Sequence, residues 1–192
     1  MSTARVRTRR WTRFEYERLI DRGVFHEDER LELLDGLLVV KELQGDPHAA
    51  AVDLVVAALR AVFGVGWLVR AHAPLALGRR SRPEPDVSVV RGSPRDYRSA
   101  APTEAVLVVE VSQTGLAFDR TRKASIYARA GIPDYWIVNL AERVLEVHHD
   151  PIPLEPPRRG WAYRLVQTLQ PGASVTPLAV AAVSISIAEL LP

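Results

Sequence analysis

Apolar and polar residues follow two different periods along the chain. Residues 46–64 carry apolar side chains at the three- and four-residue spacing of a helix with one buried face. Asp46 as N-cap, Pro47 in the first turn and Gly64 beyond the last turn mark its ends. Residues 104–112 are almost continuously apolar, which is typical of a central strand buried on both faces. The chain therefore combines amphipathic helices with a deeply buried strand.

Caps and turns mark the other elements. Thr12 and Glu15 have the spacing of a capping box, which predicts a helix ending near Gly23. Asp35 and Gly36 separate two apolar runs and predict a hairpin with a type I′ turn. Further strands are expected over residues 67–77, 85–90, 134–140, 143–150 and 161–169, and a helix over 118–130. This order predicts an α/β fold in which helices flank a mixed central sheet.

Length and composition suit a single domain over residues 1–192, with 47% hydrophobic and 25% charged residues. The sequence contains no cysteine, which excludes disulfides and thiolate metal sites. No apolar run approaches the roughly 20 residues that span a bilayer. We therefore expect a cytoplasmic protein that does not contact membranes.

The formal net charge is only +2, but the basic residues cluster. A basic arm near the N-terminus contains Arg5, Arg7, Arg9, Arg10 and Arg13, and residues 1–11 are expected to be flexible. A basic loop contains Arg79, Arg80 and Arg82. Each segment is either simply solvated or a contact for nucleic-acid phosphates.

Two carboxylates are associated with apolar strands. Glu110 lies near the end of the most hydrophobic strand, where an unpaired buried carboxylate is costly, unless the strand emerges into solvent there. Asp86 follows Pro85 at the start of another strand, where an aspartate also commonly caps a turn. If these strands are neighbours, the carboxylates converge, and Mg²⁺ or Mn²⁺ would relieve their repulsion. Such an ion can activate water and neutralise charge on a phosphate.

Lysine is rare in this chain, because Lys41 and Lys123 are the only two among 25 basic residues. Lys123 is expected near the first turn of the helix that follows the Glu110 strand. A lysine is a compact charge that can lose its proton when it is desolvated beside other cations. It could orient a water or neutralise a transition-state phosphate. The alternative is a lysine on a solvated helix face.

Four segments together resemble a known protein family. They are "WTRFEYERLIDRG", "RLELLDGLLV", "RPEPDVSVVRG" and "LVVEVSQTGLAFDRTRKASIYARAGIPDYWIVNL". They cover most of the chain and resemble the Uma-two family of restriction-endonuclease-like proteins in the PD-(D/E)XK nuclease superfamily. The resemblance implies a four-stranded mixed sheet flanked by helices, with metal-binding carboxylates on adjacent strands.

The resemblance also implies roles for individual residues. Asp86 and Glu110 match the two acids that hold the metal. The superfamily's usual lysine stands two residues after the second acid, where this chain has Ser112. The family resemblance moves that catalytic role to Lys123 on the following helix. Glu32 matches a hairpin glutamate that is expected to assist the metal or its water shell.

Three further residues have competing interpretations. His48 matches a histidine at the start of the second helix, where a merely local hydrogen bond is the alternative. Glu84 departs from the uncharged residue common in the family, and its strand parity with Asp86 would let it face the same cavity. Asp119 belongs to the matched motif, but we expect it to be the N-cap of the Lys123 helix rather than a catalytic group.

The leading hypothesis is a homodimeric endonuclease that uses Mg²⁺, or Mn²⁺, to hydrolyse DNA phosphodiester bonds with activated water. The basic loop would hold the DNA backbone. One alternative is a catalytically inactive nuclease fold that binds DNA or a partner as a homodimer. Another is a structural or regulatory homodimer. The presence of Asp86, Glu110 and Lys123 together favours the enzyme.

Overall fold

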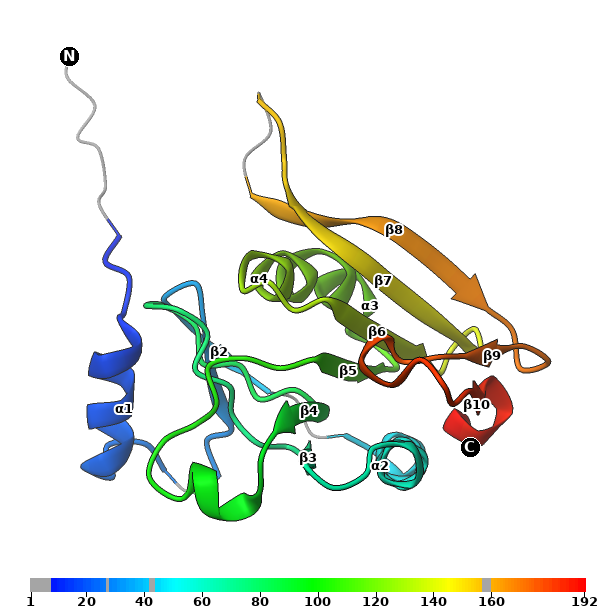
Figure 1. Ribbon diagram of the computed structural model, residues 1–192. Helices are drawn as coiled ribbons and strands as arrows, with labels where there is room; N and C mark the ends of the chain where they lie inside the picture. Colours follow the sequence, from blue (N-terminus) through cyan, green and yellow to red (C-terminus); the bar gives the residue numbers. More distant parts are fainter. Residues whose placement is uncertain (1–7, 27, 42–43, 157–159) are drawn as a thin grey trace.

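A six-stranded mixed sheet with the order β3-β4-β5-β6-β7-β8 forms the centre of the fold (Figure 1). The computed structural model describes residues 8–26, 28–41, 44–156 and 160–192. The strands are β3 (Trp67–Ala71), β4 (Val87–Arg91), β5 (Leu107–Ser112), β6 (Asp134–Asn139), β7 (Val144–Pro153) and β8 (Trp161–Leu169). β5 pairs with β6 in parallel, whereas the other four pairs are antiparallel. The predicted mixed sheet is confirmed, and β5 is buried at all six positions.

The remaining elements pack around this sheet. The helices are α1 (Arg13–Asp21), α2 (Asp46–Val62), α3 (Leu116–Phe118) and α4 (Ala124–Arg129), with a π-helical segment at Asp119–Lys123 between α3 and α4. Two small antiparallel pairs are formed by β1 (Leu31–Leu34) with β2 (Leu37–Val40), and by β9 (Ser174–Val175) with β10 (Ile185–Ser186). Short 3₁₀ turns lie at Pro94–Tyr97, Leu178–Val180 and Ile187–Leu190. Figure 1 shows the sheet between α2 and α4.

Alternation along β5 divides its side chains between two apolar cores. Val109 and Val111 pack with α2 on one face of the sheet. Val108 points to the other face and packs with residues of α4, including Tyr127. Glu110 has the parity of Val108 and therefore belongs to the α4 side of the sheet, which carries the polar residues described below.

Several local predictions are confirmed, and others need correction. The Thr12–Glu15 capping box is present at the start of α1. At the N-terminus of α2 the N-cap is Gly45, and Asp46 is already the first helical residue. The strand expected over residues 67–77 ends at Ala71, because the next residue leaves the extended conformation with a φ of 47°.

The sheet has two more strands than the four that the family resemblance implied, because the long hairpin of β7 and β8 extends it beyond β6. Arg5 and Arg7 of the basic arm lie outside the described residues. Within the part of the chain that the structure describes, no helix combines the length and apolarity needed to cross a bilayer.

The turn between β1 and β2 depends on glycine. Asp35 and Gly36 have φ values of 51° and 79°, which agrees with the predicted type I′ turn. The amide of Trp11 donates to the carbonyl of Gly36 at 2.9 Å. A Cβ atom at Gly36 would lie 2.8 Å from the Trp11 carbonyl oxygen and 2.8 Å from the Cβ of Arg10. The turn therefore docks the chain before α1 against the hairpin.

We expect Gly36→Ala to lower the free energy of unfolding by about 2 kcal/mol, because a positive φ and a backbone clash are combined. Thermal unfolding should show a decrease in Tm of several degrees. Gly172→Ala is the matched control, since a Cβ at that position meets open space. Equal melting temperatures for the two variants would contradict the role given to this turn.

Candidate functional site

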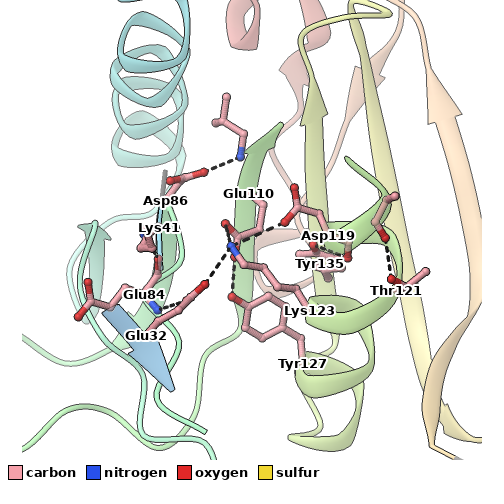
Figure 2. A network of polar contacts seen from close by, with 12 residues as sticks. Glu32, Lys41, Glu84, Asp86, Glu110, Asp119, Thr121, Lys123, Tyr127 and Tyr135 are labelled. Carbon is pink, nitrogen blue, oxygen red and sulfur yellow. Dashed lines mark hydrogen bonds and ion pairs between the residues drawn. The ribbon is translucent and has the colours of Figure 1, made fainter. Parts of the chain in front are cut away.

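A pocket of about 390 Å³ lies where β5, the β1–β2 hairpin and the π-helical segment meet. We call it the acidic pocket. Its ionisable lining residues are Glu32, Lys41, Asp86, Glu110, Asp119 and Lys123. Figure 2 shows these side chains, which come from segments far apart in the sequence. The four predicted catalytic residues, Asp86, Glu110, Lys123 and Glu32, thus lie around one cavity.

Strand register brings Asp86 and Glu110 together. β4 and β5 are antiparallel neighbours in which Val87 faces Val109, so Asp86 and Glu110 lie one residue beyond this pair. Asp86 is 6% exposed and Glu110 is 2% exposed. The Oδ2 atom of Asp86 accepts a hydrogen bond from the Val111 amide at 2.8 Å. The two strands are therefore neighbours, as the hypothesis of a shared cation requires.

The Lys123 amine lies among three carboxylates. Its Nζ atom is 2.9 Å from Glu110 Oε2, 3.7 Å from Asp119 Oδ1 and 3.9 Å from Glu32 Oε1. The side chain is buried, so the alternative of a lysine on a solvated helix face is wrong. Figure 2 shows the amine pointing into the acidic pocket. Lys123 therefore places a positive charge beside the end of β5.

The electrostatics of the acidic pocket favour a charged lysine and a neutral glutamate. Burial raises the pKa of Glu110 to about 8, and nearby Asp86 and Asp119 add to the effect, although Lys123 opposes it. Tyr127 donates its hydroxyl proton to Glu110 Oε1 at 2.6 Å. Burial alone would lower the pKa of Lys123, but the surrounding carboxylates, with Glu110 first, raise it above its usual range. The expectation that Lys123 could lose its proton beside other cations is therefore wrong, because its neighbours are acids and keep it charged.

The prediction for Asp119 is wrong. The helix begins at Leu116 with Gly115 as its N-cap, so Asp119 lies inside the helical segment and is not its N-cap. The side chain is buried in the acidic pocket, and burial raises the pKa of its carboxyl group. π-helical turns are rare in proteins, and many of those that exist lie at functional sites. Asp119 therefore lines the acidic pocket, although its sequence position had suggested a helix N-cap.

Two histidines lie beside Asp86. His48, in the first turn of α2, places Nε2 at 3.1 Å from Asp86 Oδ2, and its ring is buried. His72, which follows β3, places Nδ1 at 3.6 Å from Asp86 Oδ1. Burial opposes ionisation of Asp86, but His48 and the Val111 amide outweigh it and lower the pKa. His72 was missed because only the β3–β4 register brings it opposite Asp86.

Lys41, to which the sequence assigned no role, lines the acidic pocket, whereas Glu84, which was expected to face it, does not. The Lys41 amine donates to the backbone carbonyl of Glu84 at 2.7 Å and lines the acidic pocket. The rarity of lysine in the chain was the signal that could have identified it. Glu84 donates its amide to Glu32 Oε2 at 3.1 Å. Its own carboxylate lines a different pocket, beside Tyr16, and points away from Lys123 in Figure 2. The prediction for Glu84 is wrong because β4 begins only at Val87, so strand alternation does not extend to it.

The basic loop is divided between the interior and the surface. Arg79 and Arg80 are exposed. The Arg82 side chain is only 19% exposed, and its Nε atom is 3.4 Å from Glu17 Oε1. Arg82 therefore does not belong to an exposed DNA-binding surface, because it is turned toward α1. DNA binding by Arg79 and Arg80 stays a prediction, since both are exposed.

Comparisons with known proteins agree with this architecture. Residues 14–188 match the model of the Uma2 family, which is described as "Putative restriction endonuclease". The fold is similar to a crystal structure from Anabaena variabilis ATCC 29413, described as "a putative nuclease belonging to DUF820", with a TM-score of 0.63 and 18% identity. The match covers 90% of this chain and 96% of that chain. No curated protein matches the sequence. Because the family model spans nearly the whole chain, the protein belongs to the Uma2 family of restriction-endonuclease-like proteins.

Proposed function

We propose that this protein is a Mg²⁺- or Mn²⁺-dependent endonuclease that hydrolyses phosphodiester bonds in DNA. The observation that carries the proposal is the joint position of Asp86, Glu110 and Lys123. Two carboxylates from neighbouring strands line one pocket, and a charged amine lies 2.9 Å from one of them. Membership of a nuclease-like family supports the same reaction class. A homodimer with two such sites would cut both strands of a duplex.

The donor set of the acidic pocket fits a small divalent cation. Within residues 8–26, 28–41, 44–156 and 160–192, no three histidine or acidic side chains are placed to enclose a metal ion. Mg²⁺ is usually held by only one or two carboxylates, with waters and substrate phosphates completing its shell. Asp86 and Glu110 supply two carboxylates of this kind. Once Glu110 is ionised, four carboxylates line the pocket against two lysines, so added positive charge is favourable.

Each residue of the acidic pocket would have a separate role in the proposed hydrolysis. Asp86 and Glu110 would hold a divalent cation, which would supply Lewis-acid chemistry by activating water and neutralising charge on a phosphate. Lys123 holds a proton and can donate a hydrogen bond to the phosphate oxygen on which charge develops. Glu32 and Asp119 keep the lysine charged and oriented. His48 contacts Asp86 and helps to keep its carboxylate charged.

Cleavage of supercoiled plasmid by the purified protein tests this proposal. Nicked and linear products should form with Mg²⁺ or Mn²⁺ and should be absent with EDTA. Restoring the divalent cation to the EDTA-treated protein should restore cleavage. Cleavage that persists in EDTA would contradict the proposed chemistry. Metal binding without cleavage of any DNA form would favour an inactive nuclease fold.

Metal binding should depend on pH because of Glu110. Its pKa of about 8 means that the metal-free carboxyl group is protonated at pH 7 and ionised above pH 8. A metal ligand must be ionised, so binding at pH 7 should release roughly one proton, and affinity should rise with pH until about pH 8. Calorimetry in buffers of different ionisation enthalpy, at pH 7 and pH 9, measures this release. The same proton release at both pH values would contradict the assignment of Glu110 as a ligand.

A further inference from the structure

A second pocket, of about 430 Å³, collects arginines from four separate segments. We call it the arginine pocket. Its charged lining residues are Arg10, Asp35, Arg79, Arg80, Arg122 and Arg129. They come from the chain before α1, the β1–β2 turn, the basic loop, the π-helical segment and α4. Five guanidinium groups thus face one carboxylate, which leaves a formal excess of four positive charges.

The single carboxylate does not satisfy these arginines. Asp35 pairs with Arg129 and has its Oδ2 atom 3.7 Å from Arg122 Nε. The Nη2 atom of Arg122 is buried and has no hydrogen-bond partner in the described part of the chain. Among the ion pairs of the described residues, none involves Arg79 or Arg80. Guanidinium donors are therefore available to an anion that enters the pocket.

The basic loop is held in place before any ligand binds. The carbonyl of Arg79 accepts from the Arg13 amide at 2.8 Å, and the carbonyl of Arg80 accepts from the Gly36 amide at 2.7 Å. The hydroxyl of Ser81 accepts from the Asp35 amide at 3.0 Å. These bonds fix the loop backbone to α1 and to the hairpin turn. A preorganised site loses less conformational entropy when it binds a ligand.

The arginine pocket and the acidic pocket share two walls. The hairpin supplies Glu32 to the acidic pocket and Asp35 to the arginine pocket, and the helical segment supplies Lys123 to one and Arg122 to the other. Three residues of extended chain span roughly 10 Å. Neighbouring phosphates of one DNA strand are separated by about 3.4 Å along the helix axis, and by about twice that through space because the strand winds around the axis, so this distance corresponds to one or two nucleotides.

We infer that the arginine pocket binds a backbone phosphate of the same DNA strand that enters the acidic pocket, one or two nucleotides from the bond that is cut. Arginine suits this task because its planar fork can donate two parallel hydrogen bonds to a phosphate. The inference rests on the proposed endonuclease function and adds the position of a second contact. It gives the substrate strand a fixed direction across the two pockets.

Binding of a fluorescein-labelled 20-base-pair DNA in EDTA tests the inference without cleavage. Arg79→Ala/Arg80→Ala should bind more weakly than wild type, and the slope of log K against log salt should fall by about one, as expected for one lost phosphate contact. Arg95→Ala/Arg98→Ala is the matched control, because it removes the same charge from exposed positions outside the pocket. Equal affinities and slopes for the two double variants would overturn the inference.

Neutral methylphosphonate linkages placed one at a time locate the contact. Wild type should lose affinity at a position one or two nucleotides from the cut, and Arg79→Ala/Arg80→Ala should be insensitive there. If millimolar inorganic phosphate stabilises wild type but not the double variant, while both bind DNA equally, the pocket takes a free anion and the inference is overturned. Failure of the endonuclease proposal is a separate result, since it would show as absent cleavage with Mg²⁺ while DNA binding persists.

Discussion

Asp86→Asn should abolish metal-dependent cleavage while leaving the fold intact. The substitution keeps an oxygen that can accept from the Val111 amide, but it removes the charge that would hold the cation. Metal-ion catalysis contributes several kcal/mol to transition-state stabilisation, so cleavage should fall at least about a thousandfold. Single-turnover plasmid cleavage with saturating enzyme measures the loss, and calorimetry with Mn²⁺ should show weaker metal binding.

Asp53→Asn provides the control for this variant. Asp53 lies on the exposed side of α2, so the same change of charge occurs away from the acidic pocket. Its cleavage rate and melting temperature should equal those of wild type. If Asp86→Asn cuts as fast as Asp53→Asn, the observed cleavage belongs to a contaminating nuclease and the assignment of the metal site fails.

Lys123→Ala should separate metal binding from catalysis. Removing the amine takes a positive charge from beside Glu110, so the affinity for Mn²⁺ should stay equal or increase. Cleavage should nevertheless fall about 10²- to 10³-fold, which is typical of losing one donor to the developing charge. Isothermal titration and single-turnover cleavage report the two effects independently.

Lys123→Arg tests whether charge alone is sufficient. Arginine keeps the charge, but its planar fork cannot take the position of a compact amine among three carboxylates. We expect partial recovery of cleavage relative to Lys123→Ala. A parallel loss of metal affinity and cleavage in Lys123→Ala would instead show that the lysine only maintains the shape of the pocket.

Local sequence rules predicted the elements well because their signals are local. The Thr12–Glu15 capping box and the Asp35–Gly36 turn each depend on residues within a few positions of one another. The burial of β5 follows from its continuous apolar composition. These features indicated where helices and strands lie, and the family resemblance then placed the metal-binding carboxylates on adjacent strands.

The parts of the site that sequence reasoning missed depend on tertiary geometry. His72 reaches Asp86 only through the antiparallel register of β3 and β4. Asp119 enters the pocket because the helix already starts at Leu116, after an N-cap glycine that makes no side-chain capping bond. Glu84 lines a different pocket because β4 begins only at Val87, so strand alternation does not extend to it. No local pattern contains this information.

The π-helical segment controls the rotational phase of the helix that carries Lys123. Asp119, Lys123 and Tyr127 are spaced four residues apart, and Lys123 contacts Asp119 while both Lys123 and Tyr127 contact Glu110. In a regular α-helix with 3.6 residues per turn, each four-residue step exceeds a full turn by roughly 40°. The directions of Asp119 and Tyr127 around the helix axis would therefore differ by about 80°. A π turn holds more than four residues, so its step falls short of a full turn and offsets the drift.

The helix can therefore keep three polar groups in one line, in which Lys123 and Tyr127 contact Glu110 and Asp119 contacts Lys123. When the lysine stands on a helix instead of on the strand, a π turn is needed to keep the residues four positions before and after it on the same side of the helix. The spacing between Asp119 and Tyr127 is consequently constrained in length as well as in residue type, since losing or gaining one residue would turn one end of the line out of the pocket.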